Sequence, residues 1–305
     1  MTGSFQRYLR AKRTVDDRAL DRRVIERLRE ALSARAAASD GPLRVLEIGA
    51  GIGTMLTRAL EWELFPPGDV RYTAVDVQAE NVAELRRHVT SWAEGRDISV
   101  LGGQPLVLEG PERHITVEPA VAEAVAYADR STTGYDLLVG VALLDILDLE
   151  GLGTLLGALA PGGLYYFPIT FDGATRFRPS HPADRAVERR YHEHMDAKSG
   201  GSSRAGGDVL ARLQDRDGSL LDVAGSDWVV RPTGGTYPAD EAYFLRYILD
   251  TIEDAVGEIT DEPIQGLEEW LSRRRAQVEA GELTYHTHQL DFLGRVEGAS
   301  PRDST

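Results

Sequence analysis

The sequence predicts an α/β fold in which helices cover a mostly parallel sheet. Short β-rich segments alternate with helical ones from Leu43 onward, which is the pattern of successive β-α-β units. The first β-rich segment ends in closely spaced glycines, as a strand does where it turns directly into a helix. Hydrophobic residues make up 42% of the 305 residues and charged residues 27%, which is the composition of a globular protein.

The N-terminal residues 1–40 are expected to be helical. Thr14 and Asp17 resemble a capping box, and apolar residues recur after them at near-helical spacing until Gly41 and Pro42. The arginine-rich start has two interpretations. It is either a lid whose cations meet an anionic acceptor or the solvated face of an amphipathic helix packed on the domain.

Two β-α units follow. Residues 43–48 form the first expected strand, and a helix at 54–64 ends at the Pro-Pro-Gly run of residues 66–68. Residues 72–77 form the second strand. The next helix places apolar residues from Val82 to Val89 on one face.

The middle of the chain supplies three more strands. Residues 95–114 contain Gly-Gly and Gly-Pro pairs and are expected to form a hairpin or a loop excursion. A third strand is expected at 115–121, where Pro119 suits only an edge position because proline cannot donate to the ladder. The fourth and fifth strands are expected at 136–141 and 163–170.

Residues 172–226 are interpreted as an inserted cap, partly mobile around its glycine-serine stretch at 199–207. Strands at 228–231 and 283–293 then complete the sheet, with two helices between them at 240–256 and 263–278.

We therefore expect a single domain over residues 1–297. Its parts are the N-terminal helices (1–40), a core (43–171), the cap (172–226), the segment that completes the sheet (227–297) and a disordered tail (298–305).

Composition excludes several classes of protein. No run approaches the roughly 18 apolar residues of a transmembrane helix, and the polar N-terminus lacks the apolar core of a secretory signal. The absence of cysteine excludes disulfides, iron–sulfur clusters and cysteine-bound zinc. We therefore expect a cytoplasmic protein without a membrane partner. The net charge of −15 argues against a nucleic-acid partner, because binding phosphates requires a basic surface.

The most informative segment is the glycine-rich run at residues 47–53, Glu-Ile-Gly-Ala-Gly-Ile-Gly. Glycines at a strand-to-helix turn let the backbone approach a ligand closely. The dinucleotide fingerprint requires glycine at position 54, where this chain has Thr54. With Glu47 two residues before Gly49, and Asp76 ending the second strand, the pattern resembles that of the class I, Rossmann-like S-adenosylmethionine-dependent methyltransferases.

The resemblance covers residues 40–170 well and the last strands more loosely. It implies a doubly wound, mostly parallel seven-stranded sheet with helices on both faces and an antiparallel last strand. It also implies that the cofactor is S-adenosylmethionine, which leaves as S-adenosylhomocysteine, and that Asp76 binds the ribose hydroxyls. The full set of cofactor-binding residues carried over is Glu47, Gly49, Ala50, Gly51, Gly53, Asp76, Val77, Glu123, Ala124 and Gly140.

Catalytic residues cannot be assigned from the resemblance, since methyl transfer needs a base only where the acceptor must lose a proton. The candidates are Asp145, which follows the fourth strand, Asp172, which follows the fifth, and His192 in the cap. Candidate acceptor-binding residues are Tyr8, Arg10, His181, Tyr191 and His194. Spacing of two residues puts His192 and His194 on different helix faces, so we expect no metal site.

Three functions remain open at this stage. We expect a methyltransferase for a small-molecule acceptor, which the cap would enclose, because loops on a rigid sheet commonly determine specificity. The alternatives are an RNA or protein methyltransferase and a non-catalytic S-adenosylmethionine-binding protein. A homodimer is also left open.

Overall fold

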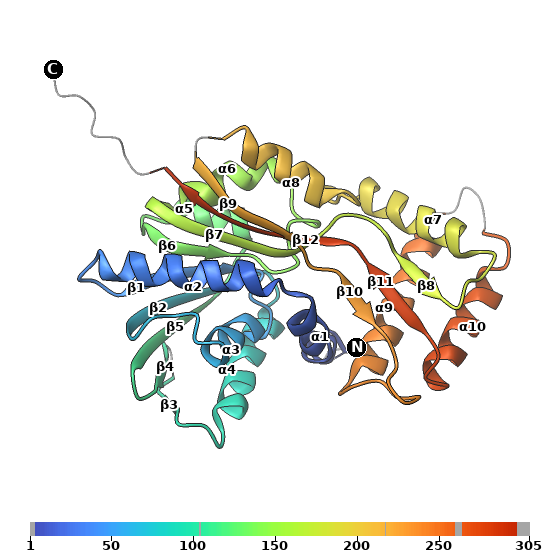
Figure 1. Ribbon diagram of the computed structural model, residues 1–305, viewed down its shortest axis with the longest axis horizontal. Helices are drawn as coiled ribbons and strands as arrows, with labels where there is room; N and C mark the ends of the chain where they lie inside the picture. The colour runs from blue at the N-terminus through green and yellow to red at the C-terminus, as the bar shows by residue number, and fades with distance from the viewer. Residues whose placement is uncertain (1–3, 104, 217, 260–263, 298–305) are drawn as a thin grey trace.

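A computed structural model describes residues 4–103, 105–216, 218–259 and 264–297, and the expected disordered tail lies outside these residues. Within them the main sheet has nine strands in the order β3-β4-β5-β2-β1-β6-β7-β12-β9 (Figure 1). In that order the strands are Ser99–Leu101, Leu106–Glu109, Arg113–Val121, Gly68–Asp76, Leu43–Ile48, Tyr135–Val139, Leu159–Phe171, Gln289–Val296 and Gly218–Gly225.

The central strands β5, β2, β1, β6 and β7 are parallel, whereas β12 is antiparallel to both of its neighbours. This confirms the expected α/β class, the mostly parallel sheet and the antiparallel closing strand. The expected number of seven strands is wrong within the described residues, because the excursion at 95–114 forms a hairpin whose second strand joins β5. That pairing ends at Val117, so Pro119 sits where β4 makes no ladder bond.

Helices cover both faces of the main sheet. On one face Val45 and Tyr72 pack into a core beneath α2 (Arg22–Ala37), α3 (Thr54–Glu61) and α4 (Ala79–Ala93). On the other, Leu46 and Ile48 pack beneath α5 (Ala124–Arg130), α6 (Leu152–Gly157, after a 3-10 turn at Leu149–Gly151) and α8 (Ala205–Gln214). The alternation along β1 follows from the two-residue period of a strand.

A second, three-stranded sheet lies beside the carboxyl ends of the main strands, in the order β10-β11-β8 (Figure 1). Its strands are Trp228–Val230, Thr284–Thr287 and Arg176–Arg178. The helices α7 (Asp184–Ala197), α9 (Glu241–Glu258) and α10 (Leu267–Glu279) accompany it, and α1 (Ser4–Ala19) packs against α9 and β10.

This second sheet corrects two sequence-based expectations. The segments at 228–231 and 283–287 do not complete the main sheet. The sixth strand is instead β9, inside the expected cap. β9 is an edge strand that pairs only with β12 in the described structure, and its side chains are mostly half-buried, so it lacks a clear alternating pattern. The expected strand at 283–293 divides at His288, whose N–H donates to Gly173 O (3.1 Å) where the chain passes between sheets.

The expected cap is therefore divided. Its α8 covers the main sheet, packing on β7 and β12, whereas β8 and α7 belong to the layer around the second sheet. That outer layer comes from α1 and from residues 176–197, 228–259 and 264–287. None of the described helices combines the length and the apolarity needed to span a membrane.

Candidate functional site

The glycine loop between β1 and α3 has a backbone that side chains would disrupt. Gly49, Gly51 and Gly53 have φ values of 63°, 55° and 82°, in the left-handed region that glycine adopts without strain. A Cβ on Gly49 would lie 2.8 Å from Leu143 Cδ1, and one on Gly51 would lie 3.1 Å from Leu9 Cδ1. The loop is thus a bare backbone surface at the carboxyl end of β1.

Asp76 holds this loop in place. Its Oδ2 accepts the Gly51 N–H (2.8 Å), while its Oδ1 accepts the Gln78 N–H (2.8 Å) and the Asn81 side-chain amide (3.1 Å). Because a carboxylate has about four acceptor positions, one on Oδ2 remains for a ligand hydroxyl. Asn81 Oδ1 in turn accepts from Gln6 Nε2 (2.9 Å), which joins α1 to the same network.

Glu47 lies beneath the loop rather than in the pocket. It is 2% exposed, and its Oε2 accepts the Tyr72 hydroxyl at 2.6 Å. Burial raises the pKa of Glu47 to about 8, against the opposing effects of the Tyr72 hydrogen bond and the Arg58 charge.

Glu47→Gln is expected to remove a loss of stability that the wild type suffers as pH rises from about 5 to 8. The folded pKa of about 8 lies above the ordinary value of 4.5. The folded state therefore binds more protons than the unfolded state in this window, and raising the pH favours unfolding. Urea unfolding at several pH values measures the slope. The exposed Glu112→Gln is the control, and equal slopes for wild type and Glu47→Gln would contradict the expectation.

One pocket of 530 Å³ opens beside this loop, between the main sheet and the outer layer. Its lining comes from α1, the glycine loop, the segments that follow β2, β5 and β6, the end of β7, and residues of α7, α9, β10 and β11. Ligands of open α/β sheets bind outside the carboxyl ends of the strands, which is where this pocket lies. A polar depression of 630 Å³ at the opposite ends of β1 and β6, lined by Arg44 and Arg71, lacks that placement.

The expected cofactor residues divide between the pocket and its support. Those lining the pocket are Gly49, Gly51, Asp76, Val77, Glu123 and Ala124. Those outside its lining are Glu47, Ala50, Gly53 and Gly140. Gly140 serves packing, since a Cβ there would lie 3.2 Å from Ile48 Cγ1, and Gly53 precedes the first residue of α3.

Part of the pocket lining is aromatic. We call the part formed by Tyr8, Tyr191, Trp228, Tyr247 and Tyr285 the aromatic chamber. These residues come from α1, α7, β10, α9 and β11, so the outer layer supplies most of the wall. The Tyr8 and Tyr247 rings stack with centroids 4.2 Å apart and planes inclined by 22°. Large, rigid aromatic walls favour a flat apolar ligand.

Two charged residues border the chamber. Asp145, in the turn after β6, has a solvent-shielded Oδ1 without a hydrogen-bond partner among the described residues. Burial raises the pKa of Asp145 to about 6, although its own backbone and Lys12 oppose the shift. Lys12 is 8% exposed, donates to Asp16 Oδ2 at 2.6 Å and lies 5.1 Å from the Trp228 ring centroid.

Other expected site residues lie outside this pocket. Arg10 pairs with Glu84 (2.8 Å). Asp172 accepts the Gly207 N–H in the first turn of α8 (2.9 Å). His192 contacts the Thr175 hydroxyl (3.0 Å), and burial lowers its pKa.

Two more histidines are occupied in structural contacts. His194 lies 2.6 Å from Glu258 Oε2, and His181 Nδ1 accepts the Ala183 N–H (3.2 Å). Of the catalytic and acceptor-binding candidates, the structure thus brings Asp145, Tyr8 and Tyr191 to the pocket. The described residues contain no group of three acidic or histidine side chains placed to hold a metal ion.

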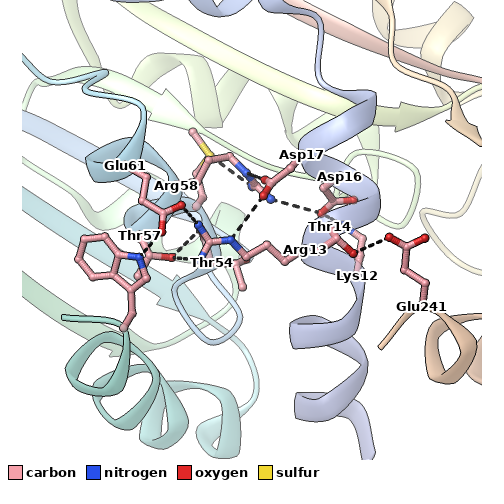
Figure 2. Close-up of polar contacts among 12 residues, drawn as sticks. Lys12, Arg13, Thr14, Asp16, Asp17, Thr54, Thr57, Arg58, Glu61 and Glu241 are labelled. Atoms are coloured by element: carbon pink, nitrogen blue, oxygen red, sulfur yellow. Dashed lines mark hydrogen bonds and ion pairs between the residues drawn. The ribbon is translucent and has the colours of Figure 1, made fainter. Parts of the chain in front are cut away.

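Helix α1 closes the pocket and is anchored by ion pairs (Figure 2). Arg13 bonds to Thr57 (3.2 Å) and pairs with Glu61 of α3, while Thr14 bonds to Glu241 Oε1 (2.7 Å) at the start of α9. Arg18 donates to the same Glu241 oxygen (2.6 Å). The structure favours the interpretation of a helix packed on the domain, because the arginines of α1 pair with acids of the domain. Tyr8, Leu9 and Lys12 of the same helix line the pocket.

Backbone strain also gathers at the pocket. Ala142 and Ile169 both line it and have φ values of 49° and 58°. A β-branched residue in the left-handed region is a costly outlier. The Ile169 N–H donates to the buried Asp291 Oδ1 (2.9 Å), which holds this conformation in place.

Several pocket residues were not singled out as site residues by sequence reasoning. They are Phe5, Gln78, Asn81, Met195, Trp228, Tyr247, Tyr285 and Gln289. Lys12 also lines the pocket. The sequence offered one signal for it, because Lys12 is one of only two lysines and Asp16 follows it at helical spacing. Trp228 and Tyr285 carried no such signal, because short strands bring them from distant parts of the chain.

Comparison with protein-family models finds no match, and neither does comparison with curated proteins. Solved structures with distant similarity include the cyclopropane synthase MmaA2 from Mycobacterium tuberculosis, at 13% identity over 89% of this chain and 82% of that one, with a TM-score of 0.45. A SAM-dependent methyltransferase from Geobacter sulfurreducens, in complex with S-adenosyl-L-homocysteine, gives 14% identity, coverage of 90% and 91%, and a TM-score of 0.42. A putative sarcosine dimethylglycine methyltransferase from Galdieria sulphuraria is 15% identical over 89% of this chain and 86% of that one, with a TM-score of 0.41.

Proposed function

We propose that this protein is an S-adenosylmethionine-dependent methyltransferase for a small-molecule acceptor. The observation that carries the proposal is one pocket lined both by the glycine loop and Asp76 and by the aromatic chamber and Asp145. A cofactor site alone would not need these aromatic walls or a second acidic side chain with a buried, unpaired oxygen.

The residues present fit the cofactor. Gly49 and Gly51 line the pocket with backbone that a ligand can approach closely, and the open acceptor position on Asp76 Oδ2 suits a ribose hydroxyl. Glu123, exposed at the start of α5, would accept from the adenine amine. The bound cofactor supplies an electrophilic methyl group on a sulfonium, so this chain has to align the acceptor and exclude water.

The size of the pocket and the net charge of the protein both favour a small acceptor. The pocket is 530 Å³ in total, and α1 lies across it. The net charge of −15 would repel a polyanion over most of the surface. The basic side chains Arg7, Arg10, Arg13 and Arg18 of α1 already pair with acids of the domain.

Calorimetry followed by a screen of methyl acceptors tests this function. We expect S-adenosylmethionine to bind, NAD not to bind, and at least one small molecule to gain a methyl group, detected by mass. Binding without a methylated product across small molecules, bulk transfer RNA and protein would instead favour a non-catalytic binding protein. Salt-sensitive RNA binding that depends on residues 1–13 would favour an RNA methyltransferase.

A further inference from the structure

We propose that the acceptor is a planar aromatic compound with a free hydroxyl group, that Asp145 takes the proton of this hydroxyl, and that Lys12 positions its oxygen. This inference rests on the proposed methyl transfer and adds the class of acceptor and the atom methylated.

Asp145 has the position and the free oxygen that a proton acceptor needs. It lies in the turn that follows the carboxyl end of β6, and the Ser202 N–H holds that turn by donating to the Asp145 carbonyl (3.0 Å). Its Oδ1 is shielded from solvent, lacks a partner among the described residues and belongs to a residue that lines the pocket. A buried polar atom left unpaired costs free energy, so this carboxylate lacks part of its hydrogen bonding and gains from a donor that reaches it through the pocket.

Lys12 provides the complementary donor. An ammonium group has three N–H donors, of which one goes to Asp16 Oδ2 in the described structure. Asp16 is itself fixed by the Trp228 indole N–H, which donates to its Oδ1 at 3.0 Å. The ammonium is therefore held at the chamber wall, where a remaining N–H can donate to an acceptor oxygen that carries developing negative charge.

The walls select a flat, uncharged ring. Tyr8, Tyr191, Trp228, Tyr247 and Tyr285 present aromatic surface from five different elements. Aromatic walls bind either another ring or a cation. Lys12 already occupies the Trp228 face, 5.1 Å from its centroid, so that face is not available to a cationic acceptor. An aromatic hydroxyl compound satisfies the rings, the carboxylate and the ammonium together.

The transfer step balances with these groups. The acceptor oxygen forms the new bond to the methyl carbon, and the bond between sulfur and that carbon breaks with its electron pair left on sulfur. The hydroxyl proton moves to the Asp145 carboxylate. Charge is conserved, because the sulfonium becomes a neutral thioether while the carboxylate becomes a neutral acid.

The pH dependence follows from the surroundings of Asp145. Lys12 faces it from α1 and Tyr191 from α7, while Asp76 and Glu123 lie at the cofactor end of the pocket. Burial raises the pKa of Asp145 to about 6, so it is ionised at neutral pH and close to the optimum for a base. We expect kcat/KM to rise with pH through about 6 and then to level.

The test compares Asp145→Asn with the exposed Asp148→Asn, three residues further along the same turn. The acceptors are 4-ethylphenol, 4-ethylaniline, 4-ethylcyclohexanol and the more acidic 4-nitrophenol. We expect the wild type to methylate the phenols and not the amine or the saturated alcohol. Asp145→Asn should lower kcat/KM for 4-ethylphenol by about 10²- to 10⁴-fold, lose the inflection near pH 6 and keep its affinity for S-adenosylmethionine in calorimetry. Asp148→Asn should resemble the wild type.

The acidic acceptor separates a proton-transfer role from a structural one. 4-Nitrophenol ionises without help at neutral pH. Asp145→Asn should therefore lower kcat/KM much less for 4-nitrophenol than for 4-ethylphenol. Equal deficits for both phenols, an unchanged pH profile, or a wild type that prefers amines or saturated alcohols would overturn this inference while leaving methyl transfer standing. A wild type that does not bind S-adenosylmethionine would overturn the proposed function itself.

Discussion

Asp76→Ala is expected to lower the affinity for S-adenosylmethionine by about 10- to 150-fold. Its carboxylate holds Gly51 through a hydrogen bond of 2.8 Å and also anchors Gln78 and Asn81. A hydrogen bond to a charged group contributes about 1.5–3 kcal/mol, and each 1.4 kcal/mol is about tenfold in affinity. The variant loses the ligand hydroxyl contact and releases the loop, so both the enthalpy and the preorganisation of binding suffer.

Isothermal titration calorimetry at neutral pH measures this loss. Asp69→Ala is the matched control, because Asp69 lies on the same strand, is exposed and does not line the pocket. The control should bind as the wild type does. An Asp76→Ala variant that is folded and binds with unchanged affinity would show that the cofactor lies elsewhere.

Arg58→Met is expected to destabilise the fold by about 3–5 kcal/mol, which is the usual effect of removing one partner of a buried ion pair. Arg58 is fully buried, and its Nε donates to Asp17 Oδ1 at 2.6 Å while its Nη2 lies 3.9 Å from Asp16 Oδ2 (Figure 2). The variant leaves the carboxylates of α1 facing α3 without this cation. At roughly 2–4 °C per kcal/mol, the midpoint of thermal unfolding should fall well outside experimental error.

Urea unfolding of Arg58→Met and Arg87→Met provides the comparison. Arg87 pairs with Glu84 on the surface, where its side chain is 75% exposed, and exposed pairs contribute about 0–1 kcal/mol. If both variants lowered the free energy of unfolding by the same small amount, the contacts of Arg58 with Asp16 and Asp17 would not be what anchors α1 to the domain.

The part of the pocket around the glycine loop was predictable because it is local in sequence. The loop at Gly49 follows directly from β1, and Asp76 ends the neighbouring strand, so strand order alone brings them together. Glycine spacing and a strand-end acid are requirements of backbone geometry and charge, which a single sequence displays.

The aromatic chamber was largely unpredictable because it is assembled from distant segments. Tyr8 meets Tyr247, and Trp228 meets Asp16, across more than two hundred residues of chain. β8, β10 and β11 are only three or four residues long, which is too short to show a two-residue period. The histidines attracted attention by their chemistry, yet His192 and His194 pack against neighbours within the outer layer.

The position of α1 also fixes an order of events during synthesis. Its residues are translated well before their partners Glu241 and Trp228, which lie 212 to 227 positions further along the chain. Closing so long a loop is entropically costly, and it cannot begin until those partners have been translated. The aromatic chamber therefore forms late in folding, and α1 stays undocked until then.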